Sequence, residues 1–261
     1  MKKILIGALL LTGCALPVMA CTGISATAKD GGYVQARTIE WGDSYLPSQY
    51  VVIPCGHEMI SYTPKGMNGA KFRARYGVVG LSIVLKDFVV EGLNEAGLSA
   101  GLFYFPHYGN YPVYDAKQNT RTVADLQLVA WMLSQFSTIE EIKAAMQDIR
   151  VVSVDTTGAS STVHWRIGDA NGRQVVLEFV DGVPCFYENE ISVLTNSPGF
   201  PWQMTNLNNY VNLYPGGAEA HQLGGVTIFP FGAGSGFQGI PGDVTPPSRF
   251  VRAAFYKATA P

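Results

Sequence analysis

The order of strand and helix signals is the feature that most constrains how this chain of 261 residues folds. Strand-like runs occupy the first 105 residues, two helical segments follow at 122–136 and 137–149, and strands resume at 161–167 and 174–180. Two adjacent amphipathic helices between groups of strands need a sheet to cover their apolar faces. The pattern therefore predicts a layered α+β domain with antiparallel sheets.

The clearest local signal is a hairpin near the amino terminus. The β-favouring runs Cys21–Ala28 and Tyr33–Trp41 are separated by Lys29-Asp30-Gly31-Gly32, a sequence typical of a tight turn. Ser137-Thr138-Ile139-Glu140 reads as a capping box that opens the second helix. A last helix is predicted over 248–257, after a Gly- and Pro-rich stretch at 216–247 that reads as a loop.

The first 20 residues read as an export signal outside the folded domain. Lys2 and Lys3 precede the apolar run Ile4–Leu11, and Val18-Met19-Ala20 suits signal peptidase I. The apolar run is too short to span a bilayer as a helix. We therefore expect a signal peptide over 1–20 and a single domain over 21–261 that is periplasmic or secreted.

A second cleavage site competes with the first. Leu11-Thr12-Gly13-Cys14 resembles a lipobox, in which Cys14 becomes a lipidated first residue. A lipid on Cys14 or Cys21 would make the chain an anchored, non-enzymatic binding lipoprotein. The two hypotheses are chemically exclusive, because Cys21 has a free α-amine only if the cut falls immediately before it.

Composition excludes several partners and cofactors. The formal net charge of −2 gives no basic surface for nucleic acid. No Cys/His spacing suggests a zinc site, and no cofactor is expected. Cys55 and Cys185 lie in apolar contexts, which predicts buried thiols, with a disulfide between them as the alternative.

A cysteine at position one combines two reactive groups. Its thiolate is a nucleophile and its α-amine can relay protons, so Cys21 needs no separate histidine. It does need positive charge near the sulfur and an acceptor for the amine. Arg37 and Glu40 lie on the partner strand of the hairpin and are candidates, with an exposed strand edge as the alternative.

Five ordered motifs resemble the choloylglycine hydrolase (bile salt hydrolase)/penicillin V acylase family of N-terminal nucleophile hydrolases. They are Cys21–Ile24, Ala36–Trp41, Glu91–Leu98, Thr195–Pro198 and Ser248–Ala253. The export signal, and the run Leu102–Tyr108, look more like a Gram-negative, Bacteroides-type branch. The resemblance implies a four-layer αββα sandwich with two antiparallel sheets. Relatives continue past residue 261, so a carboxy-terminal strand is expected to be missing.

The resemblance also implies roles for single residues. Cys21 would be the nucleophile, Arg37 would lie beside its sulfur, and Glu40, where the family usually has Asp, would hold the α-amine. The Asn94 N–H and the Asn196 side-chain amide would form the oxyanion hole. Arg249 would add positive charge near the thiolate.

The substrate is expected to be a small amide with a large apolar part. Trp41, Phe103 and Phe105 are candidate substrate contacts. A bile acid conjugated to glycine or taurine is the leading hypothesis, with penicillin V or an N-acyl-homoserine lactone as the alternative. The family also suggests a homotetramer.

Overall fold

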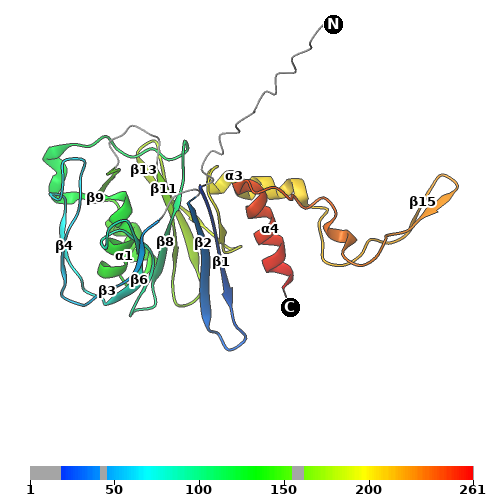
Figure 1. The fold of residues 1–261 in the computed structure, drawn as a ribbon, viewed down its shortest axis with the longest axis horizontal. Coiled ribbons are helices and arrows are strands. Elements are labelled where there is room, and N and C mark those ends of the chain that lie inside the picture. Colours follow the sequence, from blue (N-terminus) through cyan, green and yellow to red (C-terminus); the bar gives the residue numbers. More distant parts are fainter. Residues whose placement is uncertain (1–18, 42–45, 155–161, 261) are drawn as a thin grey trace, which may run out of the picture.

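Two antiparallel sheets lie face to face at the centre of the computed structural model, which describes residues 19–41, 46–154 and 162–260 (Figure 1). Among these residues the larger sheet has seven strands in the order β13-β12-β11-β8-β7-β6-β3, and the smaller has three in the order β14-β1-β2. The larger sheet contains β3 (Ser48–Ile53), β6 (Val78–Ile83), β7 (Val89–Asn94), β8 (Ser99–Tyr104), β11 (Val163–Gly168), β12 (Gln174–Val180) and β13 (Val183–Glu188), and the smaller contains β1 (Met19–Thr27), β2 (Tyr33–Trp41) and β14 (Val193–Leu194).

Helices cover the outer faces of both sheets (Figure 1). On the larger sheet lie α1 (Leu128–Gln135), against β7 and β8, and α2 (Ile139–Ala145). On the smaller sheet lies α4 (Pro246–Thr259), against β1 and β14, with α3 (Phe200–Asn206) beside it. The layers run helix, sheet, sheet, helix, so the predicted αββα sandwich is confirmed.

Shorter elements complete the described part of the chain. They are β4 (Glu58–Ile60), β5 (Lys71–Arg73), β9 (Thr122–Ala124), β10 (Arg150–Val152), β15 (His221–Leu223) and β16 (Val226–Ile228), with 3-10 helices at Ala116–Arg121, Asp125–Gln127, Leu207–Tyr210 and Ser235–Phe237. The β15–β16 hairpin projects far from the four layers (Figure 1). We call residues 215–240 the arm, and the sequence predicts only a loop there.

The predicted amino-terminal hairpin is confirmed. Strands β1 and β2 pair antiparallel, with Cys21 opposite Ile39 and Gly23 opposite Arg37. The turn closes through a hydrogen bond from the Gly32 N–H to the Asp30 carboxylate at 2.9 Å. Alternation along β2 then directs Arg37 toward the larger sheet.

The helices differ from prediction at their starts. The first begins at Leu128 rather than 122, because Thr122–Ala124 pair in parallel with β10 instead. The second is capped by Thr138 rather than Ser137: the Thr138 hydroxyl accepts the Glu141 N–H at 3.2 Å, and the Glu141 carboxylate accepts the Ser137 N–H at 2.7 Å. The capping box is real but lies one residue later. The helix predicted over 248–257 is confirmed within α4.

The main apolar core lies between the larger sheet and its helices. Trp165 and Leu102 from the sheet pack there with Leu133 and Met132 from α1 and Ile142 from α2. All five are buried, and this cluster holds most of the buried hydrophobic residues of the described structure. The opposite face of the same sheet has a different composition, and it carries the candidate site.

Candidate active site

Cys21 lies on the face of β1 that meets the larger sheet, and only 6% of its surface is exposed. Its neighbour on that face is Gly23, where a Cβ atom would stand 2.6 Å from Phe103 and 2.8 Å from Arg166. Glycine at position 23 therefore permits the close approach of the two sheets. This approach places Cys21 in the packed interior, in one cluster with Phe103.

The backbone nitrogen of Cys21 is held by a side-chain amide. It donates to Asn196 Oδ1 at 2.8 Å, and Arg249 Nη2 donates to the same oxygen at 2.8 Å. Arg249 Nη1 also donates to the Cys21 carbonyl oxygen and, at 2.6 Å, to the Thr22 hydroxyl. Burial lowers the pKa of Arg249, and the negative charges of Glu40 and Cys21 oppose that shift. The predicted residues Cys21, Asn196 and Arg249 therefore meet.

The other end of the Asn196 amide is oriented by the larger sheet. Asn196 Nδ2 donates to the Tyr104 carbonyl oxygen at 2.7 Å. A side-chain amide nitrogen carries two hydrogens, so one donor of Asn196 is still available after this bond. The amide thus links β1, β8 and α4 at one point.

Arg37 lies between the two sheets, as the sequence predicts for an inward-facing residue. Its Nη1 donates to the Val90 carbonyl at 3.2 Å and to the Leu102 carbonyl, and it lies 3.5 Å from Glu91 Oε2. Its guanidinium also stands over the Phe103 ring at 4.1 Å from the centroid. Arg37 thus reaches the same aromatic ring that packs against Cys21.

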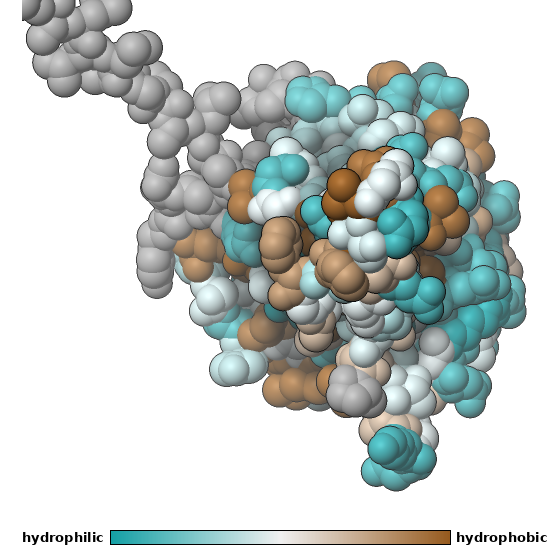
Figure 2. Space-filling view, turned by 90° about the vertical axis from the view of Figure 1, so that its right-hand side faces the viewer, coloured by the Kyte–Doolittle hydropathy of each residue, from teal (hydrophilic) through white to brown (hydrophobic). Residues whose placement is uncertain are grey.

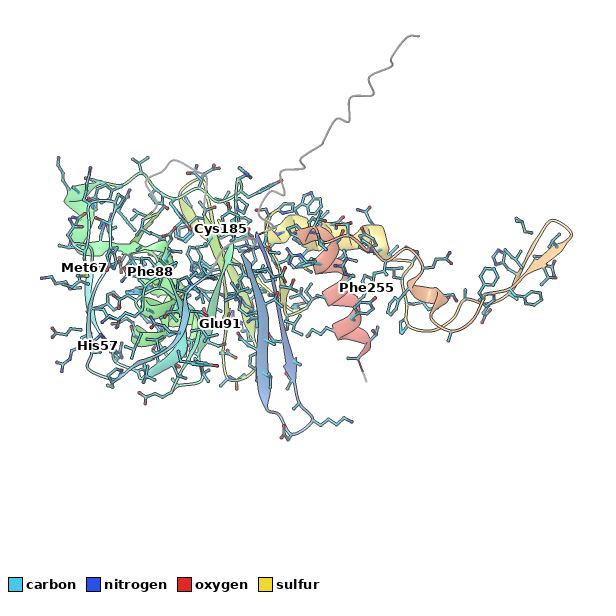
Figure 3. All side chains as sticks on the ribbon, viewed as in Figure 1. His57, Met67, Phe88, Glu91, Cys185 and Phe255 are labelled. Carbon is cyan, nitrogen blue, oxygen red and sulfur yellow. The ribbon has the colours of Figure 1, made fainter. Side chains whose placement is uncertain are left out.

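A second arginine shares Glu91. Arg166 Nη2 lies 3.0 Å from Glu91 Oε1, and Arg166 Nη1 donates to the Ile24 carbonyl of β1 at 3.0 Å. Arg166 is fully buried, so Glu91 neutralises part of two charges that lie between the sheets. Figure 3 shows Glu91 at this junction. The sequence motifs predict no role for either residue, although an arginine within the apolar strand Val163–Gly168 is a usable signal.

The roles predicted for Glu40, at the α-amine, and for Trp41, at the substrate, remain predictions. Glu40 is exposed on the outer face of β2, opposite Ala20 in the register. It faces away from Arg37, because the two residues are three positions apart on a strand whose side chains alternate between faces. Its charge reaches Arg249, as the Arg249 pKa shows. Trp41 ends β2, and its side chain lies outside the described residues.

The structure does not bring Asn94 to Cys21, and this part of the predicted oxyanion hole is wrong. The Asn94 N–H donates to the Leu98 carbonyl at 2.9 Å within a turn. Its side-chain Nδ2 donates to the Leu133 and Phe136 carbonyls at 2.8 and 2.7 Å, at the end of α1. Asn94 therefore holds the helical layer on the far side of the larger sheet.

The predicted substrate contacts Phe103 and Phe105 are also corrected. Phe103 has no exposed surface and Phe105 only 1%. Phe105 stacks on His164 at 4.2 Å between ring centroids. Phe103 lies on the face that the smaller sheet covers and clusters with Cys21. Neither ring is therefore open to a substrate.

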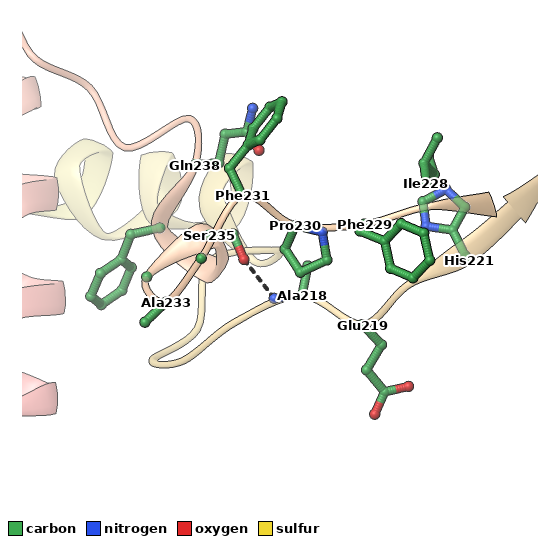
Figure 4. A pocket seen from close by; sticks show the side chains of 13 residues that line it. Ala218, Glu219, His221, Ile228, Phe229, Pro230, Phe231, Ala233, Ser235 and Gln238 are labelled. Atoms are coloured by element: carbon green, nitrogen blue, oxygen red, sulfur yellow. Dashed lines mark hydrogen bonds between the residues drawn. The ribbon is translucent and has the colours of Figure 1, made fainter.

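Two cavities of the described structure have no contribution from Cys21. One of about 610 Å³ lies on the arm (Figure 4), and one of about 630 Å³ lies between the β1–β2 turn and strands β6 and β7. Ala20 continues β1 beyond Cys21 and is itself 98% buried. The residue that precedes Cys21 thus occupies the space next to it.

The described residues hold no cluster of three or more metal-ligating side chains. Their three cysteines are free thiols, so the alternative disulfide between Cys55 and Cys185 is absent from the described structure. Cys55 is exposed and Cys185 is half-buried, contrary to the buried position that their apolar contexts predict. Within the same ranges, no helix has the length and apolar character needed to cross a bilayer.

The four layers, with a buried cysteine on β1 of the smaller sheet, are the architecture of the N-terminal nucleophile hydrolases. Residues 21–261 match the family described as linear amide C–N hydrolases, choloylglycine hydrolase family. The chain belongs to this family of amide hydrolases. The resemblance that the five motifs indicate is confirmed, whereas its Bacteroides-type branch stays a prediction.

Named relatives and solved structures agree with this assignment. The chain is 32% identical to a bile salt hydrolase/transferase of Clostridium perfringens, over 91% of this chain and 71% of the relative. It is 30% identical to a conjugated bile acid hydrolase of Lactobacillus acidophilus, over 92% and 75%. A crystal structure of a conjugated bile acid hydrolase variant from C. perfringens superposes with a TM-score of 0.79, at 30% identity over 91% of this chain and 72% of that chain. A penicillin V acylase from Agrobacterium tumefaciens gives 0.72, at 25% identity over 92% and 66%.

Proposed function

We propose that the chain is exported, cut after Ala20, and then hydrolyses conjugated bile acids with Cys21 as its first residue. The observation that carries this proposal is the set of bonds around the Cys21 nitrogen. Asn196 Oδ1 already accepts that nitrogen's hydrogen, and Arg249 binds both the Cys21 carbonyl and the same Asn196 oxygen. A backbone N–H held this way becomes an anchored α-amine once the preceding residue is removed.

In the proposed reaction the Cys21 thiol gives its proton to the α-amine, and the thiolate attacks the substrate's amide carbonyl. The tetrahedral oxyanion that forms accepts a hydrogen bond from the remaining Asn196 Nδ2–H. The α-ammonium group then protonates the departing glycine or taurine nitrogen, the C–N bond breaks, and a thioester remains. Water hydrolyses the thioester to the free acid and the thiol.

Positive charge around the site supports the thiolate. Arg249 contacts the Cys21 backbone, and Arg37 stands over the Phe103 ring that packs with Cys21. Neighbouring arginines favour the ionised sulfur. Both residues are held by partly buried hydrogen bonds to backbone carbonyls, so they are in place before the substrate binds.

We propose a conjugated bile acid as the substrate because the relatives are named for bile salts and conjugated bile acids. Those with 30–32% identity over nine-tenths of the chain are named for bile salts or conjugated bile acids. A penicillin V acylase of Pectobacterium atrosepticum is 24% identical. Penicillin V is therefore the second candidate, with N-acyl-homoserine lactones in the same class of apolar amides.

One assay panel tests the substrate. Glycocholate, taurocholate, penicillin V and a long-chain N-acyl-homoserine lactone are given to the exported protein, with Cys21→Ser as the control. We expect either bile salt to be cleaved fastest and Cys21→Ser to be inactive. Faster cleavage of penicillin V would overturn the substrate, and an active Cys21→Ser variant would overturn the nucleophile.

We also propose that the arm joins copies of the chain into the expected homotetramer. Phe229 and Phe231 are largely exposed on the arm, with Leu223 and Val226 at its hairpin. Figure 2, which looks toward the arm, shows hydrophobic residues gathered among hydrophilic ones on this face. Exposed apolar residues on a projecting hairpin are costly in an isolated chain. Light scattering should give a tetramer for the wild type and a smaller species for Phe231→Asp, and a monomeric wild type would contradict this.

A further inference from the structure

His164 and Glu178 form a buried pair that the proposed reaction does not use. They lie on neighbouring strands β11 and β12, on the face that meets the smaller sheet, with 0% and 2% of their surfaces exposed. His164 Nδ1 lies 2.9 Å from Glu178 Oε1, and His164 Nε2 lies 3.1 Å from the Thr195 carbonyl oxygen. Thr195 directly precedes Asn196.

The hydrogen bonds fix how many protons the pair holds. A carbonyl oxygen only accepts, so His164 Nε2 must carry a hydrogen to bond Thr195. One further proton must lie between Nδ1 and Oε1, because both atoms are acceptors without it. The pair is therefore either an imidazolium with a carboxylate or a neutral imidazole with a carboxylic acid, and in both forms Nε2–H points at Thr195.

The same pair also holds the segment that follows Asn196. Glu178 Oε1 accepts the Phe200 N–H at 2.8 Å, at the start of α3. The Phe105 ring stacks on His164 and fixes the plane of the imidazole. The Asn196 segment is thus held at Thr195 on one side and at Phe200 on the other, through two adjacent side chains.

We propose that His164 and Glu178 are positioning residues for the amide hydrolysis, acting through the Thr195 carbonyl on the Asn196 amide. The inference rests on the proposed function, because it assigns Asn196 Nδ2 to the oxyanion. A shift of the Thr195 carbonyl turns the next peptide and moves that donor away from the developing charge. Small misplacements of such donors lower the rate of the chemical step more than they weaken substrate binding.

The test compares two variants that each keep one of the two histidine bonds. In His164→Gln the amide nitrogen falls near the position of Nε2 and keeps a donor for Thr195. In His164→Asn it falls near Nδ1 and keeps the bond to Glu178 but not to Thr195. Both replace the ring by an amide, so a purely structural role predicts similar effects on activity.

We expect kcat to fall about 10- to 100-fold in His164→Asn and no more than about fivefold in His164→Gln, with KM within about threefold in both. Equal kcat values, or a slower Gln variant, would overturn the proposal. Glu178→Gln is the test if the histidine variants do not fold. This variant loses one of the two bonds that Glu178 makes, to His164 and to the Phe200 N–H. An unchanged kcat would overturn the proposal.

A second readout separates positioning from damage to the nucleophile. Alkylation of Cys21 by iodoacetamide involves no oxyanion, so its rate in His164→Asn should stay within about twofold of the wild type. Cys55 is exposed and also reacts, so the Cys21 peptide is followed by mass spectrometry. Trp165→Phe, on the other face of β11, is the matched control and should leave kcat unchanged.

A double variant tests whether the pair acts through Asn196. His164→Asn should add little to the loss of kcat in Asn196→Ala, because the donor it positions is already gone. Fully multiplicative losses would contradict the mechanism. The proposed function fails separately, if the wild type cleaves no amide or Cys21→Ser stays active.

Discussion

The two faces of the seven-stranded sheet are both buried, yet they differ in chemistry. The face toward α1 and α2 is filled by apolar side chains such as Trp165 and Ile167 of β11. The face toward the smaller sheet carries His164 and Arg166 from the same strand, with Glu178 from β12. Alternate residues of β11 therefore belong to two layers: one supplies apolar burial under the helices, and the other faces the smaller sheet, whose strand β1 carries Cys21.

We call the charged and polar side chains between the two sheets the polar layer, and burying them lowers the stability of the fold. Buried ion pairs such as Arg166 with Glu91 lose hydration, and apolar residues of the same volume are often as stable or more stable. The apolar layer between the larger sheet and helices α1 and α2, which we call the helix-side layer, offsets this cost through apolar burial. Charges kept between sheets at a cost in stability are typical of functional sites, and here Arg166 lies against β1, the strand that carries Cys21.

The largest expected effect comes from the Asn196 donor. Asn196→Asp keeps the acceptor for the Cys21 nitrogen and for Arg249, and it removes the Nδ2 hydrogens. We expect kcat to fall about 10²- to 10³-fold, because one oxyanion donor is lost. Steady-state kinetics on the best substrate measures this, and an unchanged kcat would mean that the polar layer does not supply the oxyanion donor.

The next effect is on stability in the polar layer. Arg166→Met should lower the free energy of unfolding by about 3 to 5 kcal/mol, because it leaves Glu91 with less compensation between the sheets. Urea titration measures it. Adding Glu91→Gln to Arg166→Met should restore part of the loss, whereas strictly additive losses would show that the two charges are independent.

A substitution in the helix-side layer should lower stability and leave activity nearly unchanged. Leu133→Ala should cost about 2 to 5 kcal/mol of unfolding free energy through the cavity it leaves. It should leave kcat and KM within about twofold of the wild type at a temperature where the variant is folded. A large fall in kcat with a folded protein would mean that the two layers are not functionally distinct.

The smallest effect concerns a buried acid beside the start of α1. Burial raises the pKa of Asp125 to about 7, against the Leu126 and Val154 N–H groups that favour its charged form. The folded state therefore binds this proton more tightly than the unfolded chain, so stability from Asp125 is present below about pH 4 and is lost as the pH rises through about 7. Asp125→Asn should raise the Tm at pH 8 by about 2 to 4 °C. Its effect should be much smaller at pH 4, and an equal shift at both pH values would contradict the raised pKa.

The sequence could predict those parts that depend on local patterns. The turn at Asp30 and Gly32 and the alternation of β1 and β2 fix the hairpin, and so the side on which Cys21 and Arg37 lie. The predicted start of the first helix is less accurate, because Thr122 pairs with a strand that is distant in sequence.

Residues whose role depends on packing between layers were not predictable in this way. Asn94 sits in a clear turn motif, but only the position of α1 shows that its amide binds helix carbonyls. Phe103 and Phe105 alternate correctly, yet alternation does not say whether a face meets a ligand or a second sheet. His164 and Arg166 had a signal, since polar residues alternate within an apolar strand, but their partners come from other strands.

The most direct test is the amino-terminal residue of the active, exported protein. Edman sequencing and intact mass, made on the same sample as the amide-hydrolysis assay, should show a chain that begins with an unmodified Cys21. Active protein that still carries Ala20, or that bears a lipid on Cys14 or Cys21, would contradict a mechanism in which one residue supplies both the sulfur and the amine.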